Sequence, residues 1–149
     1  TFILADVLTY IIVLLLGTLI MCAVAVFGFG AQFYGNWGLL LLAFLLTTFA
    51  MYAMGYLLAA VAPSVQVANV FGFIVGFILM FLSGATIPME VLPPAVQNIS
   101  RFIPLTYGVK LLKASWLQGS WEGQGLSVGV LLGVALVCTA LAARFWRWE

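Results

Sequence analysis

Long apolar stretches alternate along this chain with short segments rich in polar residues, glycine or proline. They cover residues 7–29, 39–62, 65–82 and 126–145, and a helix that crosses a bilayer needs about 20 apolar residues. The pattern therefore predicts an all-α membrane helix bundle with about four transmembrane helices. We expect residues 1–149 to form a single transmembrane domain.

Polar and restricted residues mark the ends of these stretches. Asp6 precedes the first stretch and is expected to act as its N-cap. Glycines, amides and aromatic residues in the segment 28–38 predict a loop at headgroup level. Pro63 should end the second helix, and Ser64 is placed to cap the third.

Prolines punctuate the region 84–121, which precedes the last stretch. A first short helix is expected to start at Pro93 or Pro94, because proline is tolerated in an opening turn. A second is expected after Pro104. Neither is long enough to span a bilayer, so we predict a re-entrant or interfacial helix pair whose irregular backbone is shielded by protein.

Small residues at four-residue spacing occur in two of the long stretches, and this spacing allows close helix approach in lipid. They are Ala68, Gly72 and Gly76 in the third stretch and Gly125, Gly129 and Gly133 at the last. We predict that these glycines serve helix packing. Packing within one bundle and packing between chains both fit the pattern.

Composition and charge placement identify the solvent as lipid. The chain is 66% hydrophobic and 6% charged, with net charge +1, no histidine and a mean hydropathy of +1.26, whereas globular proteins carry roughly 25% charged residues. No charged residue lies between Asp6 and Glu90. The region 84–121 and its flank carry Glu90, Arg101, Lys110, Lys113 and Glu122.

Catalytic chemistry finds little support in this composition. A membrane hydrolase needs a base or a metal site, and an ion-coupled carrier usually needs ionisable groups at membrane depth; an ion site of backbone carbonyls still fits. Neither lysine follows a glycine-rich phosphate loop. Cys22 and Cys138 lie in apolar stretches as free thiols. We expect no enzymatic activity, no metal and no cofactor in this chain.

Two short motifs distinguish the region 83–116 from the rest of the chain. Its sequence, SGATIPMEVLPPAVQNISRFIPLTYGVKLLKASW, contains the pattern P-x-E-x-L-P and then P-L-T-Y. The pattern residues are Pro88, Glu90, Leu92, Pro93, Pro104, Leu105, Thr106 and Tyr107. This stretch resembles the C-terminal signature of ABC-2 type transporter permeases, and the order of spans and the closing RFWRWE also fit.

The resemblance implies six spans with both termini cytoplasmic, of which this chain would match the last four. Two further spans and a coupling segment are then expected before Thr1. The proline-rich region would lie on the outer face of a bacterial plasma membrane, with the C-terminus cytoplasmic. Charge alone does not decide this, since Arg144 and Arg147 at one face compete with Arg101, Lys110 and Lys113 at the other.

The implied function is that of the membrane-spanning permease subunit of an ATP-driven exporter for amphipathic, lipid-like or drug-like substrates. Its partners would be a cytoplasmic ABC ATPase subunit, which would hold ATP and Mg, a second permease protomer in a homo- or heterodimer, and membrane lipid, with no nucleic acid. The alternative is a non-transporting membrane scaffold or assembly protein of the phage-infection-protein-like type, whose C-terminal end looks similar.

By the same resemblance, the third stretch lines the substrate path. Asn69, Phe73 and Phe77 are four residues apart and share a face, which either meets substrate or packs against neighbours. Thr48 and Tyr52 in the second stretch are further path candidates, although hydroxyls in membrane helices also bond to other helices.

An outer gate is expected in the proline-rich region. Its candidate residues are Pro88, Glu90, Pro93, Arg101, Pro104 and Tyr107. We expect Glu90 either to cap a re-entrant helix or to pair with Arg101 or a lysine; a solvated loop carboxylate fits the sequence equally well.

Overall fold

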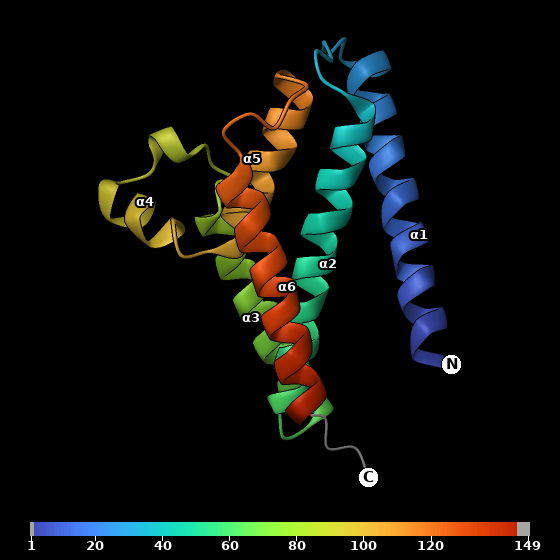
Figure 1. Cartoon of the computed structure of the whole chain (residues 1–149), viewed down its shortest axis with the longest axis vertical. Coiled ribbons are helices and arrows are strands. Elements are labelled where there is room, and N and C mark those ends of the chain that lie inside the picture. The colour runs from blue at the N-terminus through green and yellow to red at the C-terminus, as the bar shows by residue number, and fades with distance from the viewer. Residues whose placement is uncertain (1, 146–149) are drawn as a thin grey trace. The chain divides into compact units, whose positions relative to one another are not determined.

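The computed structural model describes residues 2–145, and every regular element in that part of the chain is helical (Figure 1). Four helices are long and apolar enough to cross a membrane: Ala5–Gly28, Trp37–Val61, Val65–Leu82 and Gly125–Phe145. This confirms the predicted all-α class with four candidate spans. The chain forms two compact units, residues 1–34 and 35–149, which are described separately.

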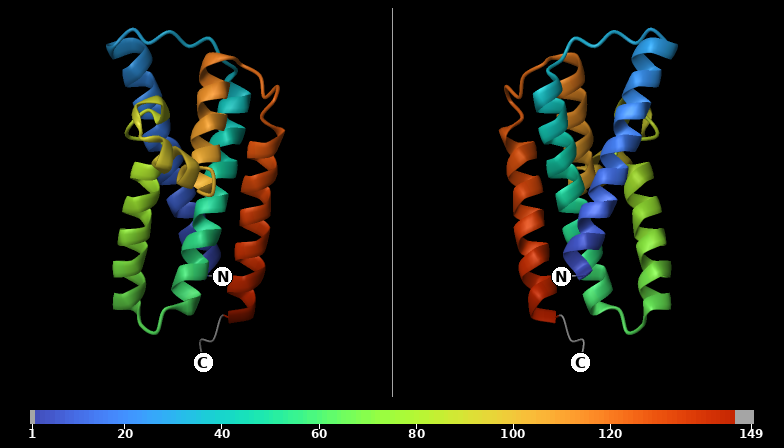
Figure 2. Two further views of the ribbon diagram at one scale, coloured as in Figure 1. Left: turned by 90° about the vertical axis from the view of Figure 1, so that its left-hand side faces the viewer. Right: turned by 90° about the vertical axis from the view of Figure 1, so that its right-hand side faces the viewer.

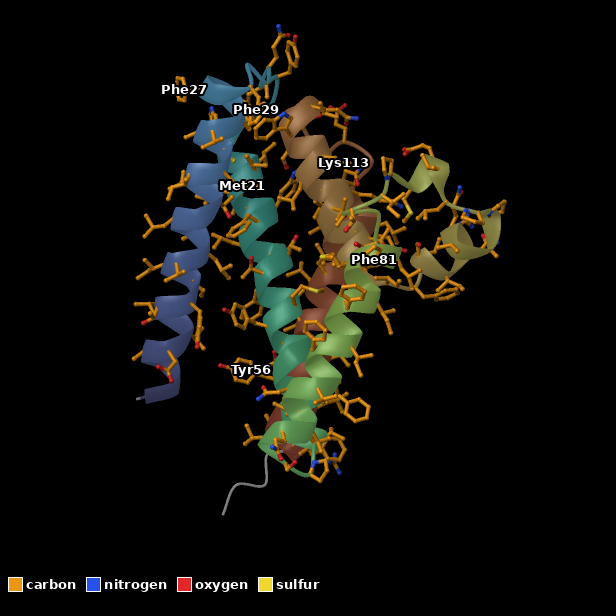
Figure 3. All side chains as sticks on the ribbon, turned by 180° about the vertical axis from the view of Figure 1, so that it is seen from behind. Met21, Phe27, Phe29, Tyr56, Phe81 and Lys113 are labelled. Carbon is orange, nitrogen blue, oxygen red and sulfur yellow. The ribbon has the colours of Figure 1, made fainter. Side chains whose placement is uncertain are left out.

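The first unit consists of α1 (Phe2–Ala23) and a π-helical turn, η1 (Val24–Gly28). The expectation that Asp6 caps this helix is wrong, because the helix begins at Phe2 and Asp6 lies inside it. Beyond η1 the chain turns at Gly30, whose φ of 64° favours glycine. Phe27 and Phe29 beside this turn are almost fully exposed (Figure 3).

Local side-chain bonds fix the ends of two long helices in the second unit. Asn36 caps α2 (Trp37–Val61) by accepting a hydrogen bond of 2.8 Å from the Gly38 backbone amide. Pro63 follows this helix. As predicted, Ser64 caps α3 (Val65–Leu82), because its hydroxyl accepts a hydrogen bond of 3.3 Å from the Val67 amide.

Residues 83–103 leave the bundle as a projecting segment (Figure 1). It contains the 3-10 turn η2 (Met89–Val91) and the short helix α4 (Pro94–Ser100), which has its proline in the first turn as predicted. The Ser100 hydroxyl bonds to the carbonyls of Leu82 and Val96. This side chain ties the end of α4 to the end of α3.

The core of the second unit lies where α2 meets α5 (Pro104–Leu117) and α6 (Gly125–Phe145). The buried residues of α2 are Ala43, Thr47, Ala50 and Ala53, and those of α6 are Ser127, Leu131, Ala135, Cys138 and Ala142. Most of them are small, so the helices approach closely. Figure 2 shows α3 and α6 on opposite sides of α2.

The predicted glycine faces do not form this core. Gly72 and Gly76 on α3, and Gly129 and Gly133 on α6, have open space where a Cβ would stand. On α6 the centre of the buried face lies about 160–200° away from these glycines, given 100° per residue. The second unit therefore does not show these glycine faces packing within the bundle.

Candidate functional site

Helix α5 runs antiparallel along the first part of α2. At the C-terminal end of α5 the Asn36 amide donates a 3.2 Å hydrogen bond to the Ser115 carbonyl, and the Trp37 and Trp116 rings meet edge to face at 6.4 Å. In the N-terminal half of α5 Gly108 packs against Thr47. Thr47 lies ten residues into α2, about 15 Å along its axis. Helix α5 therefore covers close to half of the length of α2.

Two glycines make this approach possible. A Cβ at Gly108 would overlap the Thr47 side chain, and one at Gly35 would overlap the Ser115 carbonyl oxygen. The first obstacle is a side chain that could shift, whereas the second is backbone. Both glycines are therefore required by packing rather than by an unusual backbone angle, since neither has a positive φ.

A cluster of polar side chains lies at the C-terminal end of α5. The Trp121 indole nitrogen donates a 2.8 Å hydrogen bond to the Ser115 hydroxyl, and that hydroxyl donates to the Leu111 carbonyl at 2.8 Å. Ser115 is fully buried. The cluster fixes the connection between α5 and α6 to the C-terminal end of α5.

The middle of α5 carries an ordered basic face. The Tyr107 hydroxyl donates a 2.7 Å hydrogen bond to the Arg101 carbonyl, and the Lys110 ammonium lies 5.2 Å from the centre of the Tyr107 ring. Lys113 follows on the same face and is exposed, on the side from which the projecting segment leaves (Figure 3). We call Tyr107, Lys110 and Lys113 the basic face of α5.

One turn before Lys110, Thr106 is 1% exposed and its hydroxyl has no hydrogen-bond partner in the described part of the chain. A buried hydroxyl without a partner is uncommon, because its desolvation is not compensated. Thr106 was predicted only as part of a motif. Its environment could not have been read from the sequence.

The outer-gate candidates are only partly brought together. Pro88 precedes η2, Pro93 precedes α4 and Pro104 begins α5, so these prolines set helix starts. Arg101 and Tyr107 are joined, but Glu90 is exposed. Among residues 2–145 we find no ion pair and no hydrogen bond for the Glu90 side chain, which is the behaviour of a solvated loop carboxylate.

The path candidates on α3 do share one face. The Phe73 and Phe77 rings are stacked at 6.1 Å, and both are exposed, as is Asn69. Phe81 extends the row, with its ring 4.7 Å from Phe77. Phe81 was not predicted as a path residue, although the same four-residue spacing points to it. We call Phe73, Phe77 and Phe81 the aromatic row.

The candidates on α2 are less accessible than this row. Thr48 and Tyr52 are half-buried. Their neighbour Thr47 is buried and donates a 2.7 Å hydrogen bond to the Ala43 carbonyl, so that hydroxyl is satisfied within its own helix. The aromatic row therefore offers the larger exposed surface of the two sets.

Helices of this length and apolarity define a multi-pass membrane protein, and the described residues contain no group of three or more potential metal ligands. Residues 1–144 match the family described as ABC-2 family transporter protein. The chain belongs to this family. It is a membrane domain of the ABC-2 permease type, which is a non-catalytic transmembrane component.

Two similar relatives are named nodulation protein J. That of Rhizobium leguminosarum bv. viciae is 33% identical over 118 residues, which cover 74% of this chain and 46% of the relative. That of Rhizobium meliloti (strain 1021) is 31% identical over 117 residues, covering 76% and 45%. The chain thus spans less than half of the length of these relatives.

A third relative, uncharacterized protein YhgE of Bacillus subtilis (strain 168), is 30% identical over 132 residues. The match covers 87% of this chain but 16% of the relative. The same kind of domain therefore occurs in a much longer protein. No solved structure matches the chain significantly.

Proposed function

We propose that this chain is part of the permease subunit of an ATP-driven exporter, which moves an amphipathic, lipid-like or drug-like substrate with the help of a separate ATPase subunit. The observation that carries the proposal is the family match over residues 1–144. The similarity to two nodulation J proteins across about three quarters of the chain supports it.

The geometry of α5 suits such a subunit. Trp116 is the twelfth residue after Pro104, so the start of α5 lies about 18 Å along the helix axis from the residue that carries that indole. A hydrocarbon core is about 30 Å thick, so α5 is too short to cross it. We propose that α4 and α5 form a re-entrant pair on the outer face, with the C-terminus cytoplasmic in a bacterial plasma membrane.

The aromatic row of α3 is the proposed path surface, together with Asn69 and, less directly, Thr48 and Tyr52. Exposed aromatic rings provide apolar contact area with little loss of side-chain freedom. A second permease protomer and membrane lipid would complete the path. ATP and Mg would be bound by the ATPase subunit.

The test is to purify the full-length protein with its candidate ATPase, reconstitute both and measure vanadate-sensitive ATP hydrolysis with amphipathic compounds. We expect stimulation, and we expect Phe77→Ala to reduce it. Phe71→Ala is the matched control, because Phe71 is a similarly exposed phenylalanine on another side of α3. If no ATPase associates and none is stimulated, the exporter proposal is overturned.

A non-transporting scaffold or assembly protein is the second candidate. It is favoured by the YhgE match, in which this domain is a small part of a much longer protein. The same reconstitution separates the two candidates, because a scaffold would neither recruit an ATPase nor raise its hydrolysis rate.

A further inference from the structure

We propose that the basic face of α5 binds the anionic, phosphate-type headgroup of a lipid-like molecule on the side of the membrane where α5 enters. Binding is carried by Lys110 and Lys113, with Tyr107 holding Lys110 in place. Only one part of this inference rests on the proposed function, namely that the bound molecule is the transported substrate.

The first argument is charge. Lys110 and Lys113 are both exposed, and no ion pair engages them among residues 2–145. The helices that pack against α5 supply no acid: α2 and α3 contain no charged residue, and α6 contains only Arg144 near its far end. The acids nearest in sequence, Glu90 and Glu122, are exposed in connecting segments. The cations are thus free to engage an external anion.

The second argument is order. A flexible lysine loses conformational freedom when it binds an anion, which lowers its contribution to affinity. Here the Lys110 ammonium already lies over the Tyr107 ring, and the Tyr107 hydroxyl is anchored to the Arg101 carbonyl. The position of Lys110 is therefore partly set before a ligand arrives.

The third argument is depth, and it selects a lipid-like ligand over a soluble one. Lys110 lies six residues before Trp116, about 9 Å deeper if α5 runs along the membrane normal. Indole rings mark the headgroup level, so Lys110 lies below it, and its ammonium stays at that depth because it lies beside the ring of Tyr107, three residues nearer the N-terminus of α5. Exposed Leu117 on the same side adds apolar surface near the phosphate level.

Thr106 marks the inner limit of this face. It lies one turn before Lys110, and the Cα–Cβ bond in a helix tilts toward the N-terminus, which is the positive end of the α5 dipole. Its buried hydroxyl has no partner in the described residues. Because this hydroxyl is buried, it is closed to an external ligand, and the binding surface consists of the two lysines.

The test uses the purified full-length protein in nanodiscs of phosphatidylcholine, titrated with dioctanoyl phosphatidic acid and followed by native mass spectrometry. We expect saturable binding that weakens on the order of tenfold in the Lys110→Gln/Lys113→Gln double variant, since two charge-assisted contacts are lost. Arg144→Gln is the matched control, because it removes an exposed cation at the far end of α6 and should leave binding unchanged. Dioctanoylglycerol, which lacks the phosphate, should not bind.

Equal binding by the double variant and the wild-type protein would overturn the proposal. Displacement of the lipid by millimolar inorganic phosphate would overturn the lipid-like part, because the ligand would then be a soluble anion. The binding assay needs no ATPase. If the double variant loses binding but no ATPase is recruited, the exporter proposal is refuted and this site is kept. If hydrolysis is stimulated and the double variant changes neither hydrolysis nor binding, the exporter proposal is kept and this site is refuted.

Discussion

Helices α3 and α5 both lie beside α2, yet they are packed in opposite ways. Helix α5 has 14 residues, of which five are buried, and α3 has 18 residues with none buried. The less packed helix is the more apolar one. In lipid, apolar side chains gain nothing by leaving the solvent, so small residues and polar contacts decide which faces pack. The α2, α5 and α6 helices form a fixed frame, and α3 presents a free surface.

The largest expected effect comes from Gly35→Ala, where the start of α2 meets the C-terminal end of α5. The new Cβ would overlap the Ser115 carbonyl oxygen, and backbone cannot rotate away as a side chain can. We expect a loss of about 3 kcal/mol in the free energy of unfolding, measured by thermal unfolding in detergent. Gly129→Ala, on an open face of α6, should cost almost nothing. Similar values for the two variants would contradict the described contact.

A smaller loss in the free energy of unfolding, about 2 kcal/mol, is expected for Gly108→Ala. Here the obstacle to the new Cβ is the Thr47 side chain of α2. Adding Thr47→Ala should restore most of the stability, because it removes the overlapping atoms and only a hydrogen bond within α2 is lost. The double-mutant cycle gives the coupling directly. If the two losses simply add, the two residues are not in contact.

Ser115→Ala should cost about 1.5 kcal/mol, since it leaves the Trp121 indole N–H without its acceptor. The matched control is Ser115→Ala made in a Trp121→Phe background, where no donor is stranded. The difference should appear in thermal unfolding of the full-length protein. An equal cost in both backgrounds would place the role of Ser115 elsewhere.

Thr106→Val is expected to raise the free energy of unfolding, whereas the preceding variants lower it. Its buried hydroxyl has no partner in residues 2–145, so replacing it by a methyl group should raise stability by up to about 1 kcal/mol. A destabilised Thr106→Val protein would show that the hydroxyl is bonded in the membrane. Thr47→Val, which removes a satisfied hydroxyl, is the comparison that should not stabilise.

The smallest expected change in stability comes from α3 itself. Phe77→Ala removes one ring contact on either side of an exposed side chain, so thermal unfolding should change by less than about 0.5 kcal/mol. Its effect is expected in substrate-stimulated hydrolysis instead. A large loss of stability would mean that the aromatic row is a packing element of this chain.

Much of the helical framework was predictable because local signals decide it. Pro63, Ser64, Pro94 and Pro104 restrict or cap the backbone where they stand, and the helices start and end beside them. Asp6 failed as a predicted cap because the apolar residues before it continue the helix to Phe2, so Asp6 lies inside it.

The packing was harder to predict, because it depends on which helices become neighbours. Glycine spacing on α3 and α6 was the stronger pattern in the sequence. The contact of α2 with α5 and α6 nevertheless uses alanine and serine together with Gly108 and Thr47. The contact of Lys110 with Tyr107 requires only i, i+3 spacing and could have been found. The link from Tyr107 to the Arg101 carbonyl could not, since it depends on how α4 joins α5.

The hydrogen bond from the Thr47 hydroxyl to the Ala43 carbonyl also bears on how the protein is made. Helix α2 emerges from the ribosome well before α5 and α6, the helices that later cover its small-residue face. A hydroxyl facing lipid in that interval would be costly if it had no partner. Because the Thr47 hydroxyl is satisfied by its own helix, it is not an unbonded polar group when α2 enters the bilayer ahead of its neighbours.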